Sequence, residues 1–311
     1  MITSIMYHYV RPVENSELRY LALDDFVNQL DYFSKNVGEF ISKEDWESAK
    51  NGANREGVLL TFDDGLKDHF KYVLPVLKEK NLFAIFFVNT QPLLTPVMLS
   101  VHLTHLLLSI DKSKEILESF NTLLPKEIWE KATFGVASEA YIHQTDSENN
   151  KIVKKLVNYL FDEFNVEDIL QQICEIFVGK SLEKISQDWY LSVHEVLELH
   201  NAGMKIGSHT VSHRLLSKLD KDEMYSELKR SKLQLEEITN SEIDEFSYPY
   251  GGTRSYTNLT QDYLKILNYS VAHDVNHREI TSADFIDRFT LPRFDCNLFP
   301  FGVAHSLKNT H

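Results

Sequence analysis

Two adjacent carboxylates close a run of apolar residues in the first quarter of the chain. The segment VLLTFDDG ends in Asp63, Asp64 and a glycine. Neighbouring residues on a strand point to opposite faces, so the two acids cannot share one structural role. A carboxylate at the end of a buried strand costs free energy unless a cation compensates it. The pair therefore indicates either a solvated strand end or a site that holds positive charge.

Two histidines four residues apart supply a partner for this acid pair. They are His209 and His213 in the segment GSHTVSH. In a helical turn this spacing lets both imidazoles face one ion. Two nitrogens and one carboxylate oxygen, with a fourth position left open, form the ligand pattern of a catalytic zinc-type site. Both segments follow predicted strands, at the end of a parallel sheet where such folds place their active sites.

Short apolar runs alternate with helical patterns along most of the chain. Residues 2–10, 58–64 and 82–88 are predicted strands. The run 82–88 is apolar throughout, which is typical of a parallel strand buried on both faces. Asp220 and Glu223 form a capping pair that predicts the start of a long helix. The alternation favours an α/β fold with a parallel sheet, either open or closed into a barrel.

Residues 92–190 interrupt this alternation. They hold helical patterns and little that resembles a strand, and they are too many for a plain connecting loop. We therefore predict a single domain over residues 1–311 with a helical insertion at 92–190. A lid, a partner-docking element and a cover over apolar surface are alternative roles for it. His102 and His105, within the insertion, are expected on a helix surface.

Composition excludes some classes of function. The formal net charge is −14, from 46 acidic and 32 basic residues, and this disfavours nucleic acid as a partner because phosphate binding needs clustered Lys and Arg. The two cysteines, Cys174 and Cys296, have no metal-ligand spacing and are predicted to be buried or free thiols of a reducing compartment. No signal-peptide pattern and no membrane-spanning run is seen, so a cytoplasmic location is expected.

Four segments, taken in order, resemble the motifs of a known family. TFDDG, GSHTVSHRLLSKL, FSYPYG and LPRFD are similar to those of the polysaccharide deacetylases that share the NodB homology domain, carbohydrate esterase family 4. The resemblance covers about residues 1–90 and 190–295. It implies a distorted (β/α) barrel of about seven parallel strands and metal-dependent removal of acetyl groups from amino sugars. In a cytoplasmic protein, the acetylated amino sugar would belong to a glycan precursor rather than to a wall polymer.

The resemblance also implies roles for single residues. Asp64, His209 and His213 match the family's metal ligands, and Asp63 matches its general base. Zinc is the expected ion, with cobalt, nickel and iron as alternatives, because this donor set suits all four. A divalent ion lowers the pKa of a bound water towards ~7, and a carboxylate removes the proton of that water as it attacks the carbonyl.

The third and fourth segments agree with the family only in part. The resemblance assigns the backbone N–H of Tyr250 to the developing oxyanion, and Pro249 fits the turn that presents it. The arginine that often pairs with the catalytic base is replaced here by Ser247. Arg293 of LPRFD is an alternative source of that cation, or else part of a structural ion pair.

The general acid has two candidates. Family members usually carry a late histidine in a short apolar motif, and His305 in FGVAHSL is the late candidate here. His8, at the end of the first predicted strand, would point at the same end of the sheet as the acid pair and is preferred. If neither serves, Asp63 itself would return the proton to the leaving group.

Two further functions stay open on the same residues. An O-acetyl esterase acting on a sugar or another small metabolite would need the same groups. A catalytically retired domain that binds glycan or a partner through the insertion would account for the missing arginine. The intact acid pair and histidine pair favour an enzyme, since both are costly to keep without a use.

Overall fold

The computed structural model describes residues 1–13, 18–110, 112–134, 148–156 and 167–305. The chain divides into two compact units. The first is built from Met1–Glu14, Tyr20–Thr95 and Asp188–His305, and the second mainly from Pro96–Gln187. The described part contains no helix long and apolar enough to cross a membrane. The expected cellular compartment stays a prediction.

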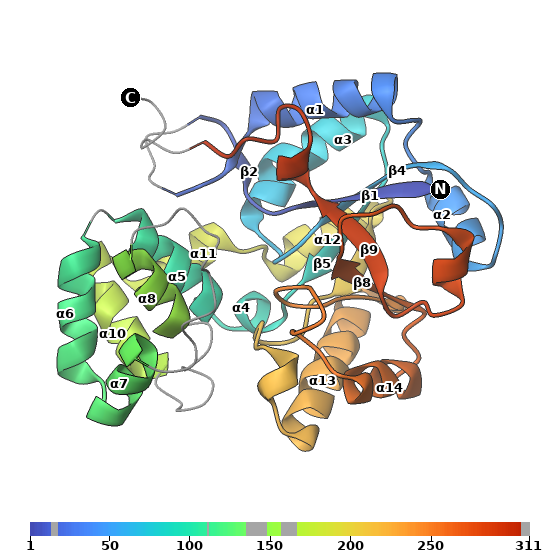
Figure 1. The fold of residues 1–311 in the computed structure, drawn as a ribbon. Helices are drawn as coiled ribbons and strands as arrows, with labels where there is room; N and C mark the ends of the chain where they lie inside the picture. Colours follow the sequence, from blue (N-terminus) through green and yellow to red (C-terminus); the bar gives the residue numbers. More distant parts are fainter. Residues whose placement is uncertain (14–17, 111, 135–147, 157–166, 306–311) are drawn as a thin grey trace. The chain divides into compact units, whose positions relative to one another are not determined.

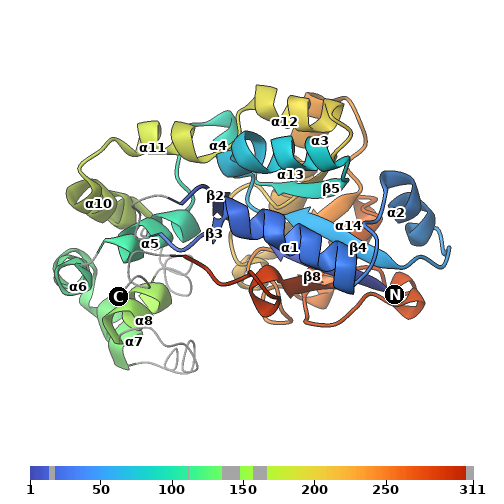
Figure 2. The same ribbon diagram turned by 90° about the horizontal axis from the view of Figure 1, so that it is seen from above.

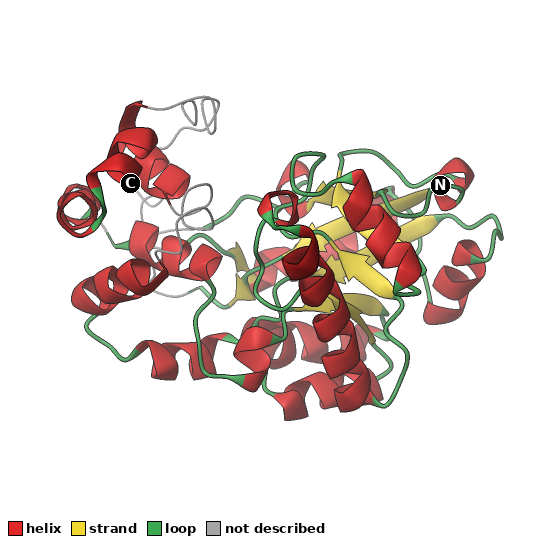
Figure 3. Ribbon diagram, turned by 90° about the horizontal axis from the view of Figure 1, so that it is seen from below, coloured by secondary structure: helices red, strands yellow, loops and turns green. Residues whose placement is uncertain are grey.

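The first unit is a closed barrel of seven parallel strands, as predicted, in the order β1-β4-β5-β6-β7-β8-β9 (Figures 1 and 3). The strands are Ile2–Tyr7 (β1), Gly57–Phe62 (β4), Ala84–Val88 (β5), Lys205–Ser208 (β6), Glu245–Ser247 (β7), Val271–Val275 (β8) and Leu291–Asp295 (β9). β1 pairs with both β4 and β9, which closes the barrel.

The first predicted strand is shorter than its apolar pattern suggested. β1 ends at Tyr7, and the chain then leaves the barrel at His8. Val10–Arg11 (β2) pairs instead with Leu21–Ala22 (β3) in a separate two-stranded sheet. The departure from the barrel at the end of β1 leaves His8 at the rim.

The strands are buried on both faces because two separate apolar layers enclose them. Along β5, Phe86 belongs to a cluster shared with the surrounding helices, whereas Ile85 and Phe87 belong to a second cluster inside the barrel. All five residues of β5 are buried. This confirms the prediction drawn from its uninterrupted apolar sequence and explains why alternation of polar and apolar residues is missing.

Helices surround the barrel (Figure 2). They are Leu23–Asn36 (α1), Lys43–Lys50 (α2), the π-helix His69–Val73 (η1), Leu74–Lys80 (α3), Gln91–Leu94 (α4), Val193–Asn201 (α12), Lys221–Thr239 (α13) and Asn258–Ile266 (α14). α13 begins at the predicted capping box, in which the Asp220 side chain accepts from the Glu223 N–H. It buries Leu228 and Leu235 against the barrel.

The regular elements described in the second unit are helices. They are Ser100–Ser109 (α5), Ser113–Leu123 (α6), Lys126–Phe134 (α7), Glu148–Lys155 (α8), Glu167–Val178 (α10) and Leu182–Trp189 (α11), of which the last ends in the first unit. The prediction of a surface position is wrong for His102, which is fully buried on α5. Apolar periodicity could not show this, because α5 buries His102, Leu103, Thr104 and Leu107, which spread over more than one face of the helix. Cys174 and Cys296 are free and buried, as predicted.

Candidate metal and catalytic site

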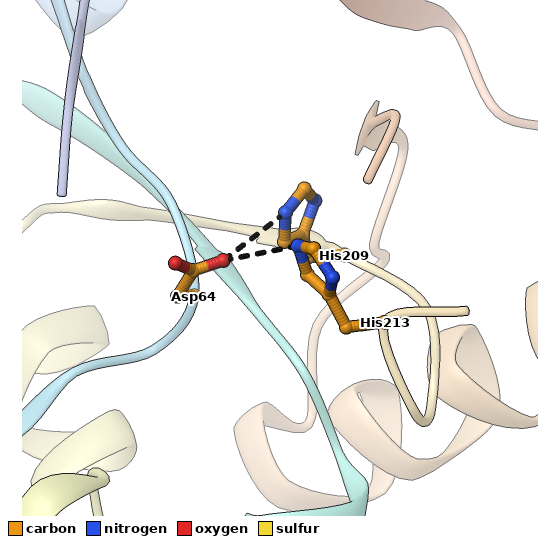
Figure 4. A group of neighbouring side chains, drawn as sticks. All are labelled: Asp64, His209 and His213. Atoms are coloured by element: carbon orange, nitrogen blue, oxygen red, sulfur yellow. Dashed lines mark ion pairs between the residues drawn. The ribbon is translucent and has the colours of Figure 1, made fainter. Parts of the chain in front are cut away.

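The carboxyl ends of β4 and β6 bring the three predicted metal ligands together (Figure 4). The Asp64 Oδ1 atom lies 3.4 Å from His209 Nε2 and 3.4 Å from His213 Nε2. One ligand atom from each residue lies within 4.8 Å of the other two, and all three side chains are buried. Two residues far from Asp64 in sequence therefore meet it at one edge of the barrel.

The two histidines do not lie on a helical turn, contrary to the reading of their spacing. They lie in the loop that follows β6, before the 3-10 turn Leu216–Lys218 (η4). Thr210 and His213 have left-handed φ values of 68° and 58°, and the His213 N–H donates to Thr210 Oγ1 over 3.0 Å. The rings converge because this loop folds back on itself. The two rings lie close together, as predicted, but a loop rather than a helical turn brings them there.

The histidine loop is tied down by Glu227 of α13. Its carboxylate accepts from the N–H groups of Val211 and Ser212, both at 2.9 Å, and from the Ser212 hydroxyl at 2.7 Å. On the other side, the Gln91 N–H donates to the Val211 carbonyl. Glu227 was not singled out from the sequence, because a glutamate on an exposed helix pattern carries no signal of such a contact.

One ligand is oriented by a backbone carbonyl. His209 Nδ1 lies 2.7 Å from the Ser247 carbonyl oxygen, which can only accept, so Nδ1 carries the proton. A ring with this one proton presents the lone pair of Nε2 to Asp64. A lone pair facing a carboxylate oxygen at 3.4 Å is a pairing that a cation satisfies. Two imidazole nitrogens and a carboxylate oxygen fit a divalent transition ion with an open position.

Asp63 and Arg293 form a buried ion pair beside this cluster. Arg293, on β9, donates to both carboxylate oxygens of Asp63 at 2.7 Å, and also to Thr61 Oγ1 and Ser247 Oγ. Burial acts to raise the pKa of Asp63, but the charge and hydrogen bonds of Arg293 outweigh it and hold the pKa well below its ordinary value. Arg293 therefore faces Asp63 as a cation, a geometry that both interpretations of this arginine allow. Ser247, at the position where an arginine was expected, adds a hydroxyl to the same pair.

The two candidate acids lie in different surroundings. His8 follows β1 and is half-buried, and because Tyr7 is paired with Phe62, His8 and Asp63 are the next residues on two neighbouring strands. His305 pairs through Nε2 with Asp25 of α1, and its backbone forms a bridge with Tyr20. The structure thus brings His8 to the site and engages His305 elsewhere.

The turn after β7 carries the predicted oxyanion donor. Pro249 is buried and Tyr250 is 39% exposed, with its ring 4.8 Å from that of His213, edge to face. Tyr250 has a left-handed φ of 67°, and Gly251 follows with 63°. A side chain on Gly251 would come within 2.2 Å of Val275, so glycine is required there.

Asp274 on β8 fixes this turn, and the sequence analysis missed it. Its Oδ1 accepts from the Gly252 N–H at 2.5 Å and its Oδ2 from the Tyr256 hydroxyl at 2.9 Å. The Tyr256 ring stacks on Tyr248 at 3.9 Å. The lone acid in the strand YSVAHDV gave no motif by which to find it.

An aromatic group also faces the acid pair from the segment after β1. Burial, and then the charge of Asp64, raise the pKa of Tyr9 well above its ordinary value. The Tyr9 ring meets Trp189 edge to face at 6.0 Å, and the Arg11 guanidinium lies 5.7 Å from the Tyr9 ring. Rings next to a buried polar site are a surface on which a sugar ring packs well.

Comparison with known proteins supports one family. The sequence profile of the family described as polysaccharide deacetylase matches residues 50–121 and 176–272, which is more than half of the chain. A comparison with curated proteins gives no match.

Solved structures resemble the fold over nearly the whole chain. They include the Streptococcus pyogenes deacetylase PplD in complex with acetate, with a TM-score of 0.57, 19% identity and coverage of 97% of this chain and 95% of that one. A de-N-acetylase from Aggregatibacter actinomycetemcomitans has a TM-score of 0.54, 14% identity and 94% coverage of both chains. IcaB from Ammonifex degensii has a TM-score of 0.53, 16% identity and coverage of 94% and 90%.

Proposed function

The chain belongs to the polysaccharide deacetylase family, and on that premise we propose that it is a metal-dependent hydrolase that removes the N-acetyl group of an amino sugar in a poly- or oligosaccharide or a glycan precursor. The observation that carries the proposal is the convergence of Asp64, His209 and His213 beside the Asp63–Arg293 pair. A ligand set and an ionised carboxylate at the carboxyl end of a barrel are the parts that hydrolysis of an acyl bond requires.

Asp64, His209 and His213 would hold one divalent ion, with zinc preferred and cobalt, nickel and iron as alternatives. Such an ion polarises the acetyl carbonyl and makes a bound water easier to deprotonate. The remaining steps fall to side chains of the chain itself. The Nδ1–H bond of His209 to Ser247 keeps its ring turned towards the ligand position throughout.

Asp63 is the proposed general base. Its carboxylate is kept ionised by Arg293 and is fixed in one orientation by two 2.7 Å hydrogen bonds. It takes a proton from the water that attacks the acetyl carbon. Because Arg293 remains charged, it also stabilises Asp63 in the charged form to which the base returns after each turnover.

His8 is the proposed general acid. It lies beside Asp63 at the rim of the barrel, from where it can protonate the amine that leaves when the C–N bond breaks. An amine needs this proton more than an alcohol does, so a histidine here favours amide hydrolysis over the O-acetyl esterase alternative. The backbone N–H of Tyr250 is the proposed donor to the oxyanion. The strongly turned backbone at Tyr250 and Gly251 supports that role.

The test combines metal content with acetate release. We expect about one divalent ion per chain in the purified protein and acetate release from some member of a panel of N-acetyl sugars and oligosaccharides. Asp64→Ala and His213→Ala should lose both, whereas His194→Ala, a 79% exposed histidine on α12, should keep both. Release from O-acetyl but not N-acetyl substrates would support the esterase. No bound ion and no release after zinc, cobalt or nickel is added would support a retired binding domain.

A further inference from the structure

A second polar cluster fills the amino end of the barrel interior, away from the acid pair. We call it the Glu245 cluster: Glu245, His273, Lys50, Lys205 and Trp46. The fully buried carboxylate of Glu245 accepts from Trp46 Nε1 at 2.6 Å and Lys50 Nζ at 3.1 Å, and Lys205 Nζ lies 3.5 Å away. Its other oxygen lies 3.1 Å from His273 Nε2. Paired cations make this burial tolerable.

Three buried polar atoms belong to strands of the barrel that also holds the Glu245 cluster and Asp63. Among the described residues, Ser4 Oγ, His273 Nδ1 and Arg293 Nε have no hydrogen-bond partner, although all three side chains are fully buried. Native structures rarely leave such atoms unpaired, since each one costs about 1–3 kcal/mol. Three of them in the interior of one barrel call for a shared explanation.

Strand register and ring contacts place the three residues near one another on neighbouring strands. His273 is paired with Leu291 on β9, and Arg293 follows two residues later on the same inward face. Ile5 of β1 is paired with Phe294 of β9. Ser4 and Arg293 come one residue before them, so they are neighbours on these two strands. The Phe87 ring lies 5.0 Å from the His273 ring and 5.4 Å from the Arg293 guanidinium.

The chemistry of the three atoms is complementary. Glu245 is ionised, because the lysine charges and the His273 hydrogen bond outweigh the burial that would raise its pKa, and the pKa is held well below its ordinary value. A carboxylate only accepts, so His273 Nε2 donates to it and Nδ1 is left as an acceptor. Arg293 Nε is a donor, and a serine hydroxyl can be either. One water can accept from Arg293 and donate to His273 and Ser4.

We propose that one buried water joins Arg293 Nε, His273 Nδ1 and Ser4 Oγ, which makes His273 a positioning residue for the arginine that holds the base. The proposal rests on the proposed function for its catalytic consequence. Arg293 has five N–H donors, and four of them are accounted for by Thr61, Asp63 and Ser247. The water would occupy the fifth, so that the guanidinium is held in one orientation.

A matched pair of substitutions separates the two sides of the imidazole. His273→Asn keeps a polar atom near the Nδ1 position, which faces the water, whereas His273→Gln keeps one near the Nε2 position, which faces Glu245. We expect kcat to fall about tenfold in His273→Gln and less than threefold in His273→Asn, with KM changed less than twofold in both. Equal losses in the two variants, or a change confined to KM, would overturn the positioning role.

Two controls separate this effect from a loss of folding. Trp46→Phe removes a hydrogen bond from the far side of Glu245, so it perturbs the same cluster while kcat should stay within twofold. In an Arg293→Met background, His273→Gln should have no further effect on kcat, because the guanidinium through which His273 acts is absent. An undiminished second effect there would show that His273 acts only on the stability of the barrel.

The water itself is tested without any assay of activity. A crystal structure at high resolution should show one ordered water within hydrogen-bond distance of Arg293 Nε, His273 Nδ1 and Ser4 Oγ, and Ser4→Ala should weaken or displace it. Nitrogen NMR of His273 should report the form protonated at Nε2. A dry site or the opposite tautomer would refute the proposal even if the enzyme were active. The expected water in a protein that releases no acetate would instead refute only the proposed function.

Discussion

The two ends of the barrel interior bury carboxylates in opposite ways. At the amino end, the acceptors of Glu245 are matched by donors from Trp46, Lys50 and His273. At the carboxyl end, Asp63 is matched in the same manner by Arg293, but the neighbouring Asp64 faces the lone pair of His209 Nε2. The matched end can only add rigidity. At the carboxyl end, acceptors that face one another have a use for a cation, and this difference supports the proposed metal site there.

Asp63→Asn should give the largest effect and should be confined to the carboxyl end. Asparagine cannot take a proton from water, so acetate release should fall about 10²–10⁴-fold. Metal content should stay near that of the parent, because Asp64 and both histidines are unchanged. Parallel metal analysis and acetate assays check this. Activity within tenfold of the parent would remove Asp63 from the role of base.

Glu245→Gln should act mainly on the stability of the protein rather than on acetate release. It weakens the hydrogen bonds that Trp46, Lys50 and His273 donate to the buried carboxylate, which costs about 1.5–3 kcal/mol of unfolding free energy. Lys50 keeps two other carboxylates, those of Asp244 at 2.8 Å and Glu47 at 2.9 Å. Urea unfolding measures that loss, and Asp45→Asn is the comparison, since its exposed ion pair with Arg55 should cost at most about 1 kcal/mol. If both changes cost the same, the amino-end cluster would not be a buried ion network in solution.

His69 should make stability depend on pH. Burial lowers its pKa from 6.5 to about 4, while the unfolded chain keeps the ordinary value. Between these two values only the unfolded state binds the proton, so stability is full above about pH 6.5 and declines as the pH falls to about 4. The loss is on the order of 3 kcal/mol. Denaturant unfolding at several pH values measures it.

His69→Gln is the matched variant for this pH effect, because glutamine can keep a donor near the His8 carbonyl that Nε2 contacts at 2.8 Å. The variant should show a flatter decline over the same range. If stability declined as steeply with falling pH in this variant, the pH effect would belong to other titratable groups.

Glu227→Ala should give the smallest effect and should sharpen the contrast between the two ends. It releases the three hydrogen bonds that hold the histidine loop, so metal affinity should fall about 10–100-fold. Titration with a competing chelator measures this. The unfolding free energy of the metal-free protein should change little, since Glu227 pairs only with loop groups at the rim. An unchanged affinity would show that the loop is rigid without it.

The sequence by itself determined the fold class and the chemistry of the site. Local patterns can be recognised from the order of residues alone. Examples are the apolar strand β5, the capping box at Asp220, and the segments TFDDG and GSHTVSH. The acid pair and the two histidines could be named because side-chain type decides what can bind a metal ion. The choice of Asp64 as the ligand came from the family resemblance. The role of Asp63 as the base came from the same resemblance.

Only the tertiary structure decided how those residues are held. Arg293 reaches Asp63 from the last strand, Glu227 ties the histidine loop from α13, and Asp274 holds the Tyr250 turn from β8. Each of these contacts joins segments distant in sequence. A single polar residue on a strand or helix carries no mark of its partner, because the partner is chosen by barrel closure and strand register rather than by spacing along the chain. The loop geometry of His209 and His213, mistaken for a helical turn, was settled by the same long-range packing.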